Sequence, residues 1–228
     1  HLSTQNQGKR SGETAREYAY RMIREQVISL ELKPGEAFND MEFAAKIGVS
    51  RTPVREAVIQ LSEESRIIEI FPQRGMRIAP IDVELVEEAR SLRVLLEKQI
   101  AGMCCEMATE EDIKWLQENV GLQEFYMENS RPEMVMQLDD EMHHKLFMIC
   151  HRELTYGMCQ KLAIHYDRIR SLSVNTVKDN TIIEDHRKII QFIAEHKKEN
   201  AMAQMEKHLS RWQLNEGKFR QEFPDYFK

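Results

Sequence analysis

The repeat of the apolar residues changes near residue 81 of this 228-residue chain. Up to that point short apolar runs are interrupted by glycine and proline, and beyond it apolar residues recur with the helical period of about 3.6. Such a change predicts a small mixed domain followed by an all-helical one. We therefore divide the chain into a polar, flexible tail over residues 1–12, a first domain over 13–81 and a second domain over 82–228.

The first domain carries the signals of three helices and a hairpin. Its apolar periodicity predicts a helix from Glu13 to the turn at Pro34-Gly35, a second over 40–47, and a third from the capping residue Ser50 to about residue 65. The β-rich runs IIEIF and MRIAPI follow, and the tetrapeptide PQRG between them predicts the turn of a hairpin. Helices joined by a short turn and followed by a hairpin are the elements of a winged helix-turn-helix.

The third predicted helix has the composition of a DNA-reading helix. Its inward stripe is apolar and consists of Val54, Ala57, Val58 and Leu61. Arg51, Thr52 and Arg55 project from the other side near its beginning, where free N–H groups can hold an anion. Arginine can fork onto the edge of guanine or clamp a phosphate, whereas the alternative is a solvated charged face. The turn before the helix and the hairpin after it favour DNA binding.

The charges of the chain are divided unequally. The net charge of −6, taken alone, argues against nucleic-acid binding. Residues 1–80, however, carry 12 lysines and arginines against 11 acids, whereas the remaining 148 residues carry 20 against 27. The acidic excess therefore lies in the second domain, and the first domain is free to bind DNA.

The second domain is predicted to be an all-helical bundle of about six helices. The expected helices span 83–107, 109–128, 132–151, 153–175, 181–196 and 199–220. The four cysteines show no zinc-ribbon spacing, so we expect reduced and mostly buried thiols. No apolar run is long enough to span a bilayer and the polar N-terminal segment is no signal peptide, so we expect a soluble, cytoplasmic protein without a membrane partner.

The segment QLDDEMHHKLF contains two overlapping Asp-x3-His pairs on one predicted helix. Relative to the apolar stripe of that helix, Asp139 and His143 border the buried side. Asp140 and His144 point almost oppositely, toward water. The first pair is therefore the candidate for a function inside the bundle.

Two later helices each direct another histidine inward. His186 lies at the centre of an isoleucine-rich stripe, and His208 lies beside the apolar residues of the last predicted helix. A single inward histidine is more often a hydrogen-bonded core residue, but a buried carboxylate with three imidazoles is costly unless protons or a cation compensate it. The four groups together favour a divalent metal, with zinc first and nickel or manganese as alternatives.

Two more polar residues lie on inward stripes. Arg93 falls on the apolar side of its predicted helix and directs a cation at the core. His165 also falls on an inward stripe, where it is either a satisfied core histidine or a competing metal ligand.

The first domain resembles the N-terminal domain of the GntR family of bacterial regulators, in LKPGEAFNDMEFAAKIGVSRTPVREAVIQL and in FPQRGMRIAPI. The residues that this resemblance places against phosphates and bases of the major groove are Ser50, Arg51, Thr52 and Arg55. It also implies that the wing tip, Arg74-Gly75, approaches the minor groove. Met41 stands where relatives often have an arginine, and Ser65-Arg66 stands where a glycine usually ends the helix.

The second domain is similar to the ligand-sensing domain called FCD of FadR-like GntR regulators, through LDDEMH, EDHRKII and MEKHL. Metal-containing members of that group use an Asp-x3-His helix and two later histidines. The metal ligands that the resemblance implies are Asp139, His143, His186 and His208. It further implies that a small carboxylate, such as a sugar acid or another organic acid, binds beside the metal, with Arg93 and His165 as candidate contacts.

These features together predict a mainly α protein with an N-terminal winged helix-turn-helix and a C-terminal helical bundle. We expect a transcriptional regulator, not an enzyme, that binds a palindromic operator as a homodimer and responds to a metal-anchored acid. Two alternatives stay open: the metal ion itself is the signal, or the site is a metal-dependent hydrolase or lyase. The last alternative needs a positioned acid or base, and no local motif supplies one.

Overall fold

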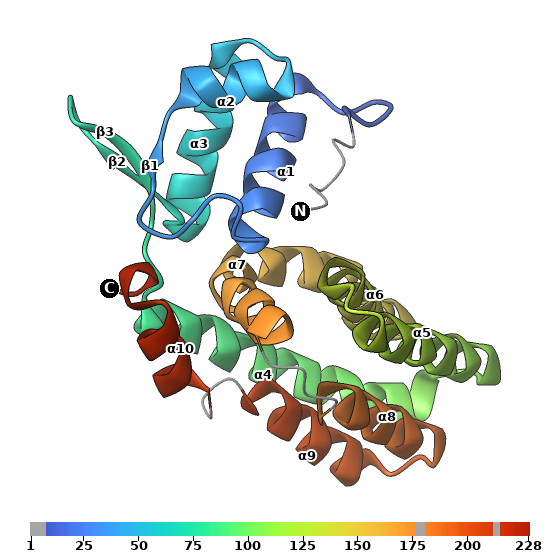
Figure 1. Cartoon of the computed structure of the whole chain (residues 1–228). Helices are drawn as coiled ribbons and strands as arrows, with labels where there is room; N and C mark the ends of the chain where they lie inside the picture. Colours follow the sequence, from blue (N-terminus) through green and yellow to red (C-terminus); the bar gives the residue numbers. More distant parts are fainter. Residues whose placement is uncertain (1–7, 177–180, 212–214) are drawn as a thin grey trace. The chain divides into compact units, whose positions relative to one another are not determined.

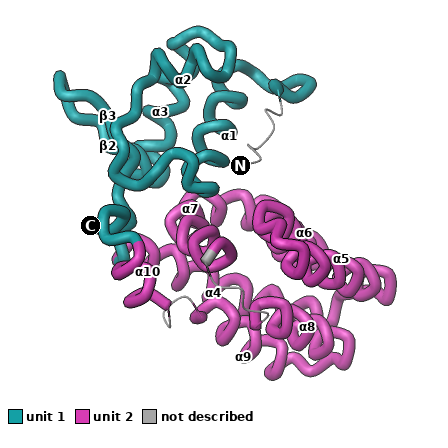
Figure 2. Tube along the Cα trace, viewed as in Figure 1, with its two compact units in different colours: residues 1–83, 223–228 teal, residues 84–222 magenta. Residues whose placement is uncertain are grey.

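The computed structural model describes residues 8–176, 181–211 and 215–228 (Figure 1). The chain divides into two compact units, one of residues 1–83 with 223–228 and the other of residues 84–222 (Figure 2). The predicted fold class is confirmed, because the described residues are mainly helical and the only sheet among them belongs to the first unit. None of the helices in these residues is long and apolar enough to cross a membrane.

Helices α1 and α2 open the first unit. α1 (Ala15–Ile28) begins with a capping box, in which the side chains of Thr14 and Glu17 accept from each other's backbone N–H groups. α2 (Asp40–Ile47) begins at Asn39, whose side-chain oxygen accepts from the first N–H groups of the helix. Both helices therefore begin where a capping side chain precedes an apolar stripe.

Helix α3 (Arg51–Ser65) is the expected DNA-reading helix. The turn before it depends on Gly48, whose φ of 75° is a left-handed conformation that glycine adopts without strain. The helix buries the stripe predicted from the sequence, which consists of Val54, Ala57, Val58 and Leu61. It ends at Arg66, which also takes a left-handed conformation, with a φ of 56°.

A three-stranded antiparallel sheet, in the order β1-β3-β2, completes the winged helix-turn-helix. β2 (Ile68–Phe71) and β3 (Gly75–Ile78) form the predicted hairpin, with Phe71 opposite Gly75. β1 (Ala37–Phe38) pairs with β3 and was not predicted, because two residues are too few to show a strand pattern.

The last residues of the chain belong to the first unit. A short 3-10 helix (Pro224–Tyr226) precedes Phe227, which forms a parallel bridge with Ile81. The Ile81 N–H donates to the Tyr226 carbonyl at 2.6 Å, and the Lys228 N–H donates to the Ile81 carbonyl at 2.9 Å. Apolar periodicity does not predict such a pairing, because it depends on where the chain end lies in the folded molecule.

Seven helices make up the second unit over its described residues (Figure 1). They are α4 (Val83–Met107), α5 (Glu110–Glu128), α6 (Pro132–Ile149), α7 (Glu153–Thr176), α8 (Thr181–Ala194), α9 (Lys198–Leu209) and α10 (Glu216–Glu222). α6 packs against α5 and α7, and α8 packs against α5 and α9. The four cysteines of this unit are buried free thiols, as expected.

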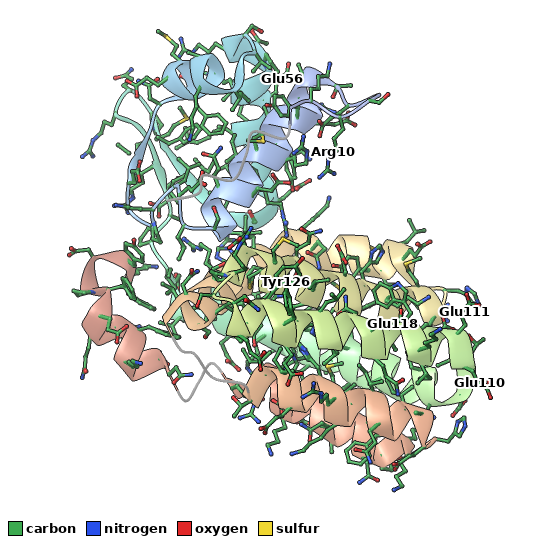
Figure 3. All side chains as sticks on the ribbon, turned by 45° about the vertical axis from the view of Figure 1, so that its right-hand side comes forward. Arg10, Glu56, Glu110, Glu111, Glu118 and Tyr126 are labelled. Atoms are coloured by element: carbon green, nitrogen blue, oxygen red, sulfur yellow. The ribbon has the colours of Figure 1, made fainter. Side chains whose placement is uncertain are left out.

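The acidic excess of the second unit lies on its surface. The side chains of Glu110, Glu111 and Glu118 on α5 are exposed (Figure 3). Exposed acids of this kind repel the phosphates of DNA, so this unit is suited to a task other than contact with DNA.

The prediction of a single helix over 199–220 is wrong, because α9 ends at Leu209 and α10 begins at Glu216. At the end of α9 the Ser210 hydroxyl donates to the Glu206 carbonyl at 2.8 Å. Serine is a weaker helix former than most of the residues of α9 before it, and the apolar period does not carry such local preferences.

We expect Arg66→Gly to raise the free energy of unfolding by up to about 1 kcal/mol, because a left-handed conformation costs an L-residue more than it costs glycine. Urea denaturation measures the change. Glu56→Gly, at an exposed position inside α3, is the matched control and should lower the same free energy by about 1 kcal/mol. A lower stability of Arg66→Gly would contradict the assignment of strain to this residue.

Candidate metal centre and DNA-reading surface

The residues expected to contact DNA are all exposed and lie at two places of the first unit. They are Ser50, Arg51, Thr52 and Arg55 at the beginning of α3, and Arg74 and Gly75 in the wing. Ser50 has the extended conformation of an N-cap residue, but its hydroxyl makes no capping bond. The hydroxyl and the first N–H groups of α3 are therefore suited to hold a phosphate.

Arg51 and Arg55 lie over one buried carboxylate. Arg51 Nε donates to Asp40 Oδ2 at 3.0 Å, and Arg55 Nη1 lies 3.6 Å from the same oxygen. The Asp40 side chain is 5% exposed, whereas the two arginine side chains are 51% and 61% exposed. The carboxylate thus holds both guanidinium groups from below and leaves their outer faces accessible.

The tip of the wing is a tight turn. The Arg74 N–H donates to the Phe71 carbonyl at 3.0 Å, and Gln73 and Gly75 both have positive φ, of 59° and 101°. Glycine is the residue that takes such a conformation without strain, so Gly75 suits this position. The turn places the exposed Arg74 side chain at the end of the hairpin.

The four expected metal ligands come together inside the second unit. One potential ligand atom from each of Asp139, His143, His186 and His208 lies within 4.8 Å of the others. Asp139 and His143 are one turn apart on α6, whereas His186 comes from α8 and His208 from the last turn of α9. Each of these side chains is at most 9% exposed. Three helices are thus required to assemble the centre.

Two of the imidazoles are oriented by polar groups on the side away from the centre. His186 Nδ1 lies 2.9 Å from Gln123 Oε1, and His143 Nδ1 lies 2.5 Å from Glu97 Oε2. Burial by itself would raise the pKa of Glu97, but Arg93 and His143 hold it well below its usual range. The Gln123 oxygen and the Glu97 carboxylate are acceptors, so the Nδ1–H group of each ring donates to them, and the Nε2 atom of each ring faces the centre.

The atoms that face one another across the centre are a carboxylate oxygen and imidazole nitrogens. His186 Nε2 lies 3.0 Å from Asp139 Oδ1 and 3.2 Å from His208 Nε2. His143 Nε2 is buried without a hydrogen-bond partner in the described part of the chain and lies 3.7 Å from the same Asp139 oxygen. The other Asp139 oxygen is paired with Arg170. A divalent cation would bond to all of these atoms at once, and a donor set of one oxygen and three nitrogens fits zinc, nickel or manganese.

Burial sets the protonation states of the centre. It lowers the pKa of His208 to about 3 and also lowers the pKa of His186, so both rings are neutral at pH 7. Burial alone would raise the pKa of Asp139, but Arg170, His143 and His186 hold it well below its usual range. A carboxylate and neutral imidazoles are the forms in which these side chains bind metals.

A cavity lies beside the centre. It offers about 50 Å³ to the centres of water molecules, which is room for several waters or a small organic acid. Its polar lining consists of Arg93, Asp139, Tyr166, Arg170, Ser173, His208 and Arg211. Arg93 is paired with Glu97 at 2.6 Å, and its guanidinium lies 5.1 Å from the centre of the Tyr166 ring. His165 is fully buried but does not belong to the described lining.

Sequence reasoning identified the inner residues of the centre and missed most of their supports. Gln123, Glu97 and Arg170 come from α5, α4 and α7. A fourth, Asp185, lies 3.8 Å from His208 Nδ1 and accepts from Arg211. The i, i+4 spacing of Arg93 and Glu97 was a usable signal, since it predicts an ion pair on the buried side of α4. The other pairings join distant parts of the chain and leave no such signal.

Two family models together match most of the chain. Residues 15–78 match bacterial regulatory proteins of the gntR family, and residues 88–211 match the FCD domain. The chain belongs to the GntR family and carries an FCD domain. It is therefore a DNA-binding transcriptional regulator and not an enzyme, as predicted.

Two relatives are similar to this GntR regulator over most of their length. The HTH-type transcriptional repressor RspR of Escherichia coli is 28% identical over 91% of both chains. The Nta operon transcriptional regulator of Aminobacter aminovorans is 26% identical over 81% of this chain and 86% of its own. Among solved structures, E. coli McbR/YncC has a TM-score of 0.74 at 18% identity and covers 92% of this chain and 99% of its own. That likeness supports the fold of the regulator.

We expect acid to destabilise the metal-free protein, because the pKa of His208 falls from 6.5 to about 3 on folding. Between pH 6.5 and about pH 3 the His208 ring is protonated in the unfolded chain but not in the folded protein. The free energy of unfolding is therefore unaffected by this ring above about pH 6.5 and decreases as the pH falls below that value. From pH 7 to pH 5 this loss is about 2 kcal/mol, measurable by urea denaturation with a chelator present.

The control variants separate His208 from the other histidines. From pH 7 to pH 5 the free energy of unfolding of His208→Gln should decrease less than that of the wild type. The difference between the two decreases should be about the 2 kcal/mol assigned to this ring. The free energy of unfolding of His151→Gln, a change at an exposed position, should decrease as much as that of the wild type. An equal decrease in all three proteins would contradict the assignment to His208.

Proposed function

We propose that the second unit of this GntR regulator binds a divalent metal, with zinc first, and a small carboxylate effector that modulates the binding of operator DNA in the bacterial cytoplasm. The observation that carries the proposal is the convergence of one buried carboxylate with imidazole lone pairs from three helices. A buried set of acceptors without a cation is unfavourable, and the adjacent cavity contains cationic side chains suited to an anion.

The proposed metal ligands are Asp139, His143, His186 and His208. When bound, the metal supplies a positive charge and a coordination position for one oxygen of the acid. The four side chains would already supply the usual number of ligands for zinc, so an oxygen of the acid would be a further ligand, which five-coordinate zinc or octahedral manganese would allow.

The effector is proposed to be a small carboxylate because of the size and charge of the cavity. Arg93, Arg170 and Arg211 line it, and its space suits a small acid. Each arginine already has an acidic partner in the protein, so the effector shares these cations with Glu97, Asp139 and Asp185. We propose Arg93 as the principal contact, and we assign His165 to the buried core.

The first unit is proposed to read DNA as part of a homodimer. We assign the contacts with the major groove to Ser50, Arg51, Thr52 and Arg55, and the approach to the minor groove to Arg74 and Gly75.

Leu154 and Met158 lie one turn apart on α7 and are 89% and 74% exposed. Large apolar side chains exposed to this extent support contact with a second copy of the chain.

We expect at least one small organic or sugar acid to raise the midpoint of thermal unfolding of the metal-loaded wild type. An acid at one hundred times its dissociation constant stabilises a protein by about 2.7 kcal/mol, which shifts the midpoint by several degrees. His186→Ala removes one metal ligand and should lose both the bound metal and the shift. Metal analysis of the same samples accompanies the thermal measurement.

His151→Ala serves as the matched control, because this exposed histidine lies outside the proposed centre and should keep the shift. An equal shift in His186→Ala would contradict binding of the acid beside the metal. If zinc alone changes the affinity for DNA while every acid leaves it unchanged, the ion itself is the signal.

We expect Arg55→Ala to weaken binding to a DNA fragment enriched from a random duplex pool by about 1–3 kcal/mol, since a guanidinium that forks onto a base contributes that amount. Fluorescence anisotropy at fixed salt measures the affinity. Lys188→Ala, on the exposed side of α8 in the second unit, removes the same charge and should bind as the wild type does. Unchanged binding by Arg55→Ala would remove this residue from the reading surface.

A further inference from the structure

Asp40 is a buried acid at the place where the protein is proposed to meet an acidic polymer. Its side chain is 5% exposed and lies beneath the accessible side chains of Arg51 and Arg55. A negative charge so close to the phosphates of DNA weakens attraction at every sequence. We therefore ask which role the Asp40 carboxylate has that a neutral side chain would lack.

Capping of α2 is not that role. Asn39 Oδ1 accepts from the N–H groups of Met41 and Glu42, at 3.0 Å and 3.2 Å, so the beginning of the helix already has its cap. The Asp40 side chain is instead directed at α3, where Oδ2 accepts from Arg51 Nε at 3.0 Å. The contacts of the carboxylate therefore link the first turn of α2 to the first turns of α3.

The contacts leave both arginines able to read a base. The bond from Arg51 uses Nε, and its two terminal amino groups stay available for the two acceptors on the edge of guanine. Arg55 approaches the same oxygen with Nη1, at 3.6 Å. A free arginine side chain loses rotamer entropy on binding, and a carboxylate that holds the guanidinium beforehand reduces that loss.

We propose that Asp40 is a positioning residue for DNA specificity, which orients Arg51 and Arg55 toward base edges and away from the phosphate backbone. The inference rests on the proposed contact of these arginines with DNA. It predicts opposite effects on two affinities. Without the carboxylate, binding to the preferred sequence weakens, whereas binding to unrelated DNA is unchanged or strengthens because a repulsive charge is gone.

The test starts with selection from a random pool of duplex DNA by the wild-type full chain, and the enriched duplexes supply the preferred sequence. The affinities of wild type and Asp40→Asn for that sequence and for an unrelated duplex are then measured at the same salt. We expect the ratio of the two affinities to fall about tenfold or more in Asp40→Asn. Loss of folded protein lowers both affinities equally and leaves their ratio unchanged, so a merely structural role does not produce this result.

Two controls isolate the contact from the charge. Glu42→Gln removes an exposed acid two residues along the same helix turn and should keep the ratio of the wild type. In a background of Arg51→Ala with Arg55→Ala, the change at Asp40 should no longer lower the ratio, because the groups it positions are absent. If Asp40→Asn fails to fold, Asp40→Ser removes the same carboxylate with less bulk and takes its place.

The inference is overturned if the ratio of the two affinities is unchanged in the Asp40 variant, or if it decreases equally in Glu42→Gln. Either result leaves the proposed reading surface in place. A fall that persists in the background without the two arginines overturns it as well. If the wild type enriches no sequence at all, the proposed DNA contacts fail and the inference fails with them.

Discussion

The proposed sensor site depends on how the Asp139 carboxylate is shared. One of its oxygens is paired with Arg170, and the other faces the imidazoles of His143 and His186. Arg170 keeps the buried carboxylate ionised, while burial keeps His186 and His208 neutral. The carboxylate oxygen and the imidazole nitrogens therefore meet in one buried place with little access to water. A divalent cation in their midst is the simplest group that satisfies all of them at once.

Both units place a buried carboxylate beneath groups that we propose face a ligand. Asp40 holds two arginines at the surface of the first unit, and Asp139 holds an arginine and imidazoles inside the second. In each case the carboxylate is paired, as a buried charge must be, and the paired groups lose freedom before the ligand arrives. The proposed ligands have opposite requirements, because DNA needs accessible cations and a small acid needs an enclosed site with a metal.

The sequence predicted most helix boundaries and the inner groups of the centre, because both follow from apolar stripes. Asp139, His143, His186 and His208 each border or interrupt such a stripe, so their burial was predictable one helix at a time. Their supports were not predictable in this way, because Gln123 and Arg170 reach the centre from other helices. The end of α9 at Ser210 and the pairing of Phe227 with Ile81 depend on local bonding and on position in the fold.

X-ray absorption at the edge of the bound metal tests the central claim most directly, since it counts and identifies the ligand atoms in solution. For zinc the account predicts one ion per chain, three imidazole nitrogens at about 2.0–2.1 Å and carboxylate oxygen at about 2.0–2.2 Å. His186→Ala should lose one nitrogen from this shell or lose the ion. Sulfur atoms at about 2.3 Å, or a chain that binds no divalent metal, would contradict the account.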